Sequence, residues 1–192
     1  MKGNEIMKVT LVRHGLTDYN QNRRIQGFSD IPLNATGIEQ AESARDFLSE
    51  ETFDAIYSSP LVRAYKTAEI INEKHALDIV THDKLKEQNF HAFEGWYVSE
   101  VIKKYPEGDL PGIERIEDLA VRAKEALDDI YKHMDYDAHV LITAHSRTIK
   151  AILHHFDSEI DIKMMPLENC SVSRIEYDGK DGKILEMNVE TH

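Results

Sequence analysis

The chain has 192 residues, a formal net charge of −12 and one cysteine, Cys170. This length suits a single domain over residues 1–192, and a hydrophobic content of 41% is enough to build a buried core. The acidic balance disfavours nucleic acid and anionic membranes as partners, because both are negatively charged. A site for an anionic ligand therefore requires a local cluster of cations. A single cysteine excludes an internal disulfide.

The sequence also bears on location. No run approaches the ~20 apolar residues that a membrane-spanning helix needs. The first residues carry Glu5 and lack the apolar stretch of a secretory signal. The expected location is the cytoplasm, and the lone cysteine fits a reducing compartment.

Short apolar runs alternate with helical patterns along the chain. The apolar runs predict strands at residues 9–12, 55–57, 77–80, 139–143, 170–177 and 184–189. Apolar residues at helical spacing predict helices at residues 36–48, 60–71, 98–105, 114–134 and 147–156. Two helix starts rest on capping signals, a capping box over residues 36–39 and an N-cap followed by proline at Ser59-Pro60. The alternation indicates an α/β fold, a three-layer α/β/α sandwich with a mostly parallel sheet and a closing pair of strands.

Two histidines follow predicted strands. His14 lies in the run Arg13-His14-Gly15 after the first strand, and His145 follows strand 139–143 just before a helix. Ligands of such sheets bind at the carboxyl ends of strands. An arginine beside a histidine at this position is costly to bury unless an anion is present. The pattern therefore favours an anion site over two unrelated structural histidines.

Further motifs follow in order between about residues 8 and 175. They are the run around Arg-His-Gly at 11–20, the segments 24–33, 37–41 and 57–68, the acid segment 85–87 followed by Glu94-Gly95, and His145. Arg-His-Gly alone is weak evidence, but the ordered set resembles the histidine phosphatase superfamily, which has a phosphoglycerate mutase-like fold. The resemblance implies a histidine acid-type phosphatase that hydrolyses a small-molecule phosphate ester without a metal or other cofactor.

The resemblance also implies roles for single residues. His14 would be the nucleophile that forms a phosphohistidine, with one ring nitrogen held by a backbone carbonyl such as that of Gly15. Glu87, rather than Glu94, would protonate the leaving group and then act as a base on water. The phosphate would be held by the forks of Arg13 and Arg63 and by His145 as an imidazolium. Additional phosphate contacts are expected from Asn20, Gln26, Gly27 and Ser146.

Two positions depart from the family pattern. Ser146 follows the second histidine where the family usually has glycine, and it would be strained if that position needs a positive φ. His91 stands in the acid loop where glycine is also usual. Both substitutions bear on the range of substrates more than on the type of reaction.

The sequence leaves two alternative functions open besides that of a phosphatase. The segment between Glu87 and His145 lacks the long insertion of cofactor-dependent phosphoglycerate mutases, which favours a phosphatase and leaves a mutase as the alternative. A catalytically silent phosphate-binding protein is a third reading. The remaining histidines show no zinc-ligand spacing, so no metal is expected. A homodimer through an edge strand is left open.

Overall fold

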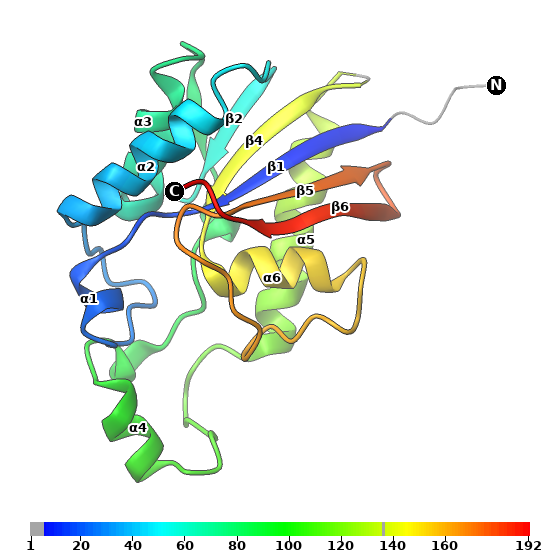
Figure 1. Ribbon diagram of the computed structural model, residues 1–192. Helices are drawn as coiled ribbons and strands as arrows, with labels where there is room; N and C mark the ends of the chain where they lie inside the picture. Colours follow the sequence, from blue (N-terminus) through cyan, green and yellow to red (C-terminus); the bar gives the residue numbers. More distant parts are fainter. Residues whose placement is uncertain (1–5, 136) are drawn as a thin grey trace.

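A computed structural model describes residues 6–135 and 137–192, so Glu5 lies outside the described residues. Its centre is a six-stranded sheet in the order β3-β2-β4-β1-β5-β6 (Figure 1). The strands are β1 (Met7–Arg13), β2 (Ala55–Ser58), β3 (Ile79–Thr81), β4 (His139–Ala144), β5 (Val172–Tyr177) and β6 (Gly182–Val189). The first four strands pair in parallel, and β5 and β6 add an antiparallel edge. The predicted sandwich with a mostly parallel sheet is confirmed.

Helices cover both faces of this sheet. On one face lie α2 (Ala35–Phe47) and α3 (Val62–Asn72), and on the other lie α5 (Ile116–Lys132) and α6 (Ser146–His154) (Figure 1). Neighbouring strand residues point to opposite faces, so Leu11 packs with α5 and α6 while Val12 packs with α2 and α3. The central strands are apolar on both sides because each side is buried.

The helix starts differ from those predicted. Asn34, not Thr36, caps α2, because its Oδ1 accepts the Gly37 N–H at 2.9 Å. Helix α3 begins at Val62, and Leu61 before it is extended, so Ser59 and Pro60 lie outside the helix. Two short helices complete the fold, α1 (Asp18–Gln21), which was not predicted, and α4 (Val98–Lys104), which was.

The acid segment lies in a stretch over residues 82–95 that has no α-helix and no strand. It contains two single turns of 3₁₀-helix, η1 (Asp83–Leu85) and η2 (His91–Phe93), and is otherwise irregular. None of the helices among the described residues is long and apolar enough to cross a membrane.

Strand register determines which residues meet at the carboxyl edge of the sheet. Arg13, the last residue of β1, pairs with Ala144, the last residue of β4. The next residues along each strand, His14 and His145, therefore leave the sheet side by side. Ser58 at the end of β2 pairs with Thr143, which brings the start of α3 to the same edge.

Candidate active site

His14 and His145 form a buried pair at this edge, with ring centroids 5.2 Å apart. The Nδ1 atom of His14 lies 2.7 Å from the Gly15 carbonyl oxygen. A carbonyl only accepts, so Nδ1 carries the proton and Nε2 keeps its lone pair. The predicted carbonyl of Gly15 is thus confirmed. Glycine is needed there because a Cβ would collide with the Gly37 carbonyl.

Two arginines reach the histidine pair from different elements. Arg13 donates from its NH1 group to the Leu167 carbonyl, and Arg63 on α3 donates to the carbonyls of Ser29 and Gly27, each at 2.8 Å. The Nε atoms of both arginines are buried without a hydrogen-bond partner in the described structure, and so is Nδ1 of His145. Buried donors are nearly always satisfied in native proteins. Two unsatisfied arginine donors and an unpartnered imidazole nitrogen beside His14 indicate a place for an anion.

Burial and positive charge set the protonation of the pair. Burial lowers the pKa of His14 well below its usual value, and the charges of Arg63 and Arg13 lower it further. The pKa of His145 is lowered in the same way by burial, Arg63 and His14. Without a bound anion the neutral ring of His145 is favoured, and the imidazolium expected for the phosphate complex stays a prediction. Burial lowers the pKa of Arg63 only to about 10, so this guanidinium stays charged at neutral pH.

Glu87 lies next to this cluster, just after η1. Its Oε1 accepts the Gln88 N–H at 2.9 Å, and its Oε2 lies 3.4 Å from the Arg147 N–H at the start of α6. Glu87 is also the carboxylate that acts most strongly on the charges of Arg13 and Arg63. The structure thus brings this carboxylate to the same edge as the two arginines and the histidine pair.

The backbone around Glu87 is held by Arg122 on α5. Its guanidinium donates to the carbonyl oxygens of Lys84, Lys86 and Glu87 at 2.9, 2.6 and 2.7 Å. It also forms an ion pair with Glu114, with Nε 2.6 Å from Oε1. The sequence analysis missed Arg122, because nothing in its helical context reveals three carbonyl partners from a distant loop.

The carboxylate of Glu94 is engaged in hydrogen bonds with a neighbouring loop. Its Oε1 accepts the Phe28 N–H at 2.8 Å, and its Oε2 accepts the Ser29 hydroxyl at 2.6 Å. Residues 27–29 form the loop whose carbonyls, at Gly27 and Ser29, also accept hydrogen bonds from Arg63. Glu94 thus fixes the loop around Arg63, which agrees with its expected unsuitability as the acid.

The other expected phosphate contacts lie around the same edge. The Thr17 hydroxyl lies 3.0 Å from Asn20 Oδ1 and 2.8 Å from Gln26 Oε1. Gly27, at a φ of 55°, offers its carbonyl to Arg63. Contacts of these residues with phosphate stay a prediction.

The two residues that depart from the family pattern, Ser146 and His91, have different backbone conformations. Ser146 begins α6 with a helical conformation, so no strain arises there, and its contact with phosphate stays a prediction. His91 has a φ of 47°, in the left-handed region that glycine adopts freely. Its N–H donates to Asn89 Oδ1 at 2.9 Å, and its side chain is exposed.

Three further residues support the histidines and were not predicted to do so. The Ser59 hydroxyl lies 2.8 Å from His145 Nε2, the Thr67 hydroxyl accepts the Gly15 N–H at 3.1 Å, and the Asn169 amide donates to the His14 carbonyl at 2.9 Å. Ser59 follows the end of β2, so the rule that pointed to His14 and His145 would have found it. Thr67 and Asn169 carry no comparable signal in the sequence.

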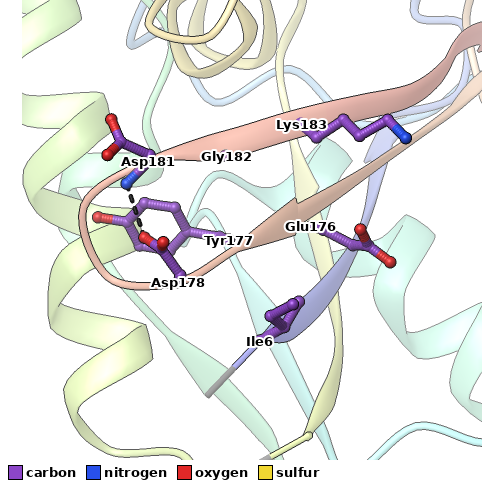
Figure 2. A pocket seen from close by; sticks show the side chains of 7 residues that line it. All are labelled: Ile6, Glu176, Tyr177, Asp178, Asp181, Gly182 and Lys183. Carbon is purple, nitrogen blue, oxygen red and sulfur yellow. Dashed lines mark hydrogen bonds between the residues drawn. The ribbon is translucent and has the colours of Figure 1, made fainter. Parts of the chain in front are cut away.

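A hollow at the opposite end of the sheet is a second candidate for a functional site. It lies at the turn between β5 and β6, lined by Ile6, Glu176, Tyr177, Asp178, Asp181, Gly182 and Lys183 (Figure 2). Asp178 Oδ1 accepts the N–H groups of Lys180 and Asp181, at 2.9 and 2.7 Å, so this carboxylate closes its own turn. The buried cations gather instead around the two histidines.

Comparison with known proteins agrees with this geometry. The model of the histidine phosphatase superfamily (branch 1) matches residues 9–190. The chain belongs to the histidine phosphatase superfamily. It is 37% identical to "Uncharacterized phosphatase PhoE" of Bacillus subtilis (strain 168), over 96% of this chain and 95% of that protein. It is 28% identical to "Phosphoserine phosphatase 1" of Hydrogenobacter thermophilus, over 97% and 94% of the two chains. The crystal structure of phosphoglycerate mutase from Bacillus anthracis str. Sterne superposes with a TM-score of 0.86 at 25% identity, covering 98% of this chain and 95% of that one.

Proposed function

We propose that this histidine phosphatase hydrolyses phosphate monoesters of small molecules through a phosphohistidine on His14. The observation that carries the proposal is the set of buried, unpartnered nitrogen atoms on Arg13, Arg63 and His145 beside a neutral His14 ring. A phosphomonoester supplies three acceptor oxygens and roughly −1.5 to −2 charge. Donors of this kind match both the oxygens and the charge.

The first chemical step transfers the phosphoryl group to His14. The lone pair of Nε2 forms a bond to phosphorus while the bond from phosphorus to the ester oxygen breaks. Glu87, protonated for this step, gives its proton to the departing oxygen. Arg13, Arg63 and His145 stabilise the charge on the phosphoryl oxygens as it passes between the two partners.

The second step regenerates the enzyme. Water attacks phosphorus, its proton passes to Glu87, and the bond between nitrogen and phosphorus breaks to release inorganic phosphate. In a mutase the phosphoryl group would pass to a second hydroxyl of the bound sugar acid instead of to water. The similarity to a phosphoglycerate mutase keeps that alternative open. The cytoplasm as location and a homodimer stay predictions.

Trapping the intermediate tests the route. The protein is mixed with a 32P-labelled phosphomonoester, and the reaction is quenched in alkali. Peptide mapping then locates the labelled residue. We expect acid-labile, alkali-stable label on His14 and none in a His14→Ala variant, which should also lose steady-state turnover while keeping its circular dichroism spectrum. The exposed His133→Ala is the matched control and should retain label and turnover.

The outcomes separate the three functions. Label on His14 with release of phosphate supports the phosphatase, and label with transfer between positions of a phosphoglycerate supports the mutase. Normal turnover by the His14→Ala protein would refute the proposed nucleophile. Absence of label and of turnover across a panel of phosphate esters would indicate a binding protein.

A further inference from the structure

His145 has one ring nitrogen in a hydrogen bond and one without a partner. Its Nε2 atom lies 2.8 Å from the Ser59 hydroxyl oxygen, and its Nδ1 atom is buried with no hydrogen-bond partner among the described residues. Because Ser59 already occupies Nε2, only Nδ1 is left to contact an anion at the site. A contact with a phosphate oxygen requires a donor, so Nδ1 must carry a proton when phosphate is bound.

The hydrogen bonds of Ser59 decide where its own proton points. The Leu61 N–H donates to the Ser59 hydroxyl oxygen at 3.3 Å, so this oxygen already accepts one proton. Ser59 is fully buried, and the hydrogen bonds of the described residues give its hydroxyl proton one acceptor, Nε2 of His145. Buried polar groups are nearly always hydrogen-bonded, so we expect the Ser59 hydroxyl to donate to Nε2.

This hydrogen bond distinguishes the protonation states of His145. Nε2 can accept the hydroxyl proton only if it has a lone pair, which leaves the proton of the neutral ring on Nδ1. An imidazolium would carry a proton on Nε2 as well, so Nε2 and the Leu61 N–H would both donate to the Ser59 oxygen. The hydroxyl proton would then be buried without an acceptor, at a cost in free energy that the neutral ring avoids.

The charges around His145 also favour the neutral ring. Burial is the largest cause that lowers the pKa of His145, and four nearby groups lower it further: Arg63, His14, Arg13 and Arg122. Carboxylates act on Arg13 and Arg63, namely those of Glu87, Glu168, Asp30 and Glu94. In the described structure, the hydrogen-bond partner of the His145 ring is a neutral hydroxyl and not a carboxylate.

We infer that Ser59 is a positioning residue that holds His145 as a neutral ring with its proton on Nδ1, from which it donates to a phosphate oxygen. Both histidines of the pair then carry their proton on Nδ1, His14 facing the Gly15 carbonyl and His145 facing the anion. His14 thus presents a lone pair for attack, and His145 presents a donor for binding. The inference rests on the proposed function for the identity of the anion, and it assigns a neutral donor in place of the imidazolium that the family resemblance implies.

Nuclear magnetic resonance of the wild-type protein tests the tautomer directly. Two-bond correlations between the ring protons and nitrogens of 15N-labelled histidine distinguish a nitrogen that carries a proton from one that does not. In the complex with inorganic phosphate at neutral pH, we expect a proton on Nδ1 of His145 and none on Nε2. The His145→Gln variant identifies the His145 signals by their loss. A proton on both nitrogens, or on Nε2 alone, would overturn the inference.

Removal of the hydroxyl tests the part played by Ser59. In Ser59→Ala we expect the His145 spectrum to show both neutral tautomers in exchange. We also expect kcat for p-nitrophenyl phosphate to fall about 10-fold, because the donor to the phosphoryl group is no longer held in place. Ser59→Thr keeps a hydroxyl at this position and should restore both the spectrum and kcat. An unchanged His145 spectrum in Ser59→Ala would refute the role of Ser59, whatever the effect on kcat.

Ser58→Ala is the matched control. Ser58 is the neighbouring residue and is equally buried, and its hydroxyl donates to the Ser59 carbonyl and accepts from the Thr143 hydroxyl, each at 2.8 Å. We expect this variant to unfold at a lower urea concentration, while its His145 spectrum and kcat stay close to those of the wild type. A change in the His145 spectrum as large as that in Ser59→Ala would overturn the inference, because any disturbance of this segment would then shift the tautomer.

The spectrum also separates this inference from the proposed function, because it requires bound phosphate but no turnover. The predicted tautomer in a protein that hydrolyses none of the phosphate esters would refute the proposed hydrolysis and support the role of Ser59. An imidazolium in an active enzyme would overturn the inference and leave the proposed function in place.

Discussion

Arg63 combines two tasks in one side chain. Its terminal nitrogens hold the carbonyls of Gly27 and Ser29, while its Nε is left without a partner beside the histidine pair. One guanidinium thus shapes the loop and supplies a donor to the site. Separating these tasks requires a substitution that fills the space without the charge.

For Arg63→Met we expect the inhibition constant of inorganic phosphate to rise about 10- to 100-fold, because a hydrogen bond to a charged group contributes ~1.5–3 kcal/mol. Competitive inhibition of p-nitrophenyl phosphate hydrolysis measures this constant. Circular dichroism checks the fold, since the two carbonyls lose their donor as well. An unchanged constant in a folded variant would remove Arg63 from the phosphate site.

Cys170 shows how burial decides reactivity at the scale of one residue. It is fully buried at a φ of 54°, and burial raises the pKa of its thiol to about 12. A thiol of this kind is rarely a thiolate at neutral pH. We expect iodoacetamide, a thiolate reagent, to leave the activity of the folded protein unchanged, and rapid inactivation with label on Cys170 would contradict this.

At the scale of elements, the acid loop depends on a helix far from it in sequence. Arg122 on α5 donates to three backbone carbonyls of the loop, at residues 84, 86 and 87. The Gln88 side chain adds a hydrogen bond to the Glu114 carbonyl at 2.6 Å. The loop has little secondary structure of its own. Its geometry, and that of Glu87 with it, is therefore set by packing against α5.

Loosening this attachment should affect proton transfer selectively. For Arg122→Met we expect kcat to fall about 10-fold or more for an alkyl phosphate, whose leaving oxygen needs the proton of Glu87, and less for p-nitrophenyl phosphate, whose leaving group needs little assistance. The control is Arg115→Met, at the exposed N-cap residue of the same helix. Equal losses with both substrates would assign Arg122 to overall stability rather than to positioning.

The element scale also shows what could be read from the sequence. Strands β1, β2 and β4 were predicted because apolar runs there are bounded by polar residues, and His14 and His145 were found because they follow two of these strands. The start of α3 was wrong because Ser59 serves the site, with its hydroxyl beside His145, instead of capping the helix. Short α1 was missed since four residues show no periodicity. Arg122 acts through residues distant in sequence, which spacing along the chain does not reveal.

At the scale of the whole molecule, buried neutral histidines link stability to pH. The pKa values of His14 and His145 are lowered by burial and by the arginines, and burial also lowers those of His75, His82 and His139. In the unfolded chain these groups take up protons below about pH 6.5. The unfolded state then binds more protons than the folded one, so the free energy of unfolding falls as the pH falls.

We expect this free energy, measured by urea unfolding, to decrease between pH 7.5 and 5.5, with each fully buried histidine contributing about 1 kcal/mol. The double variant His14→Asn, His145→Asn should show a shallower decrease. Inorganic phosphate should reduce the slope in the wild-type protein, because a bound anion offsets the arginine charges that disfavour protonation. A free energy that is constant over this range would show that the histidines are not held neutral.

The irregular segment between α6 and β5 has a consequence for synthesis of the protein. Leu167 and Asn169 support Arg13 and His14 across 154 and 155 positions of the sequence. His14 is thus synthesised long before the two residues that support it and its neighbour Arg13. Nascent chains that stop before this segment should carry His14 in an unordered setting. Only a chain synthesised beyond Asn169 should therefore acquire the complete arrangement around His14.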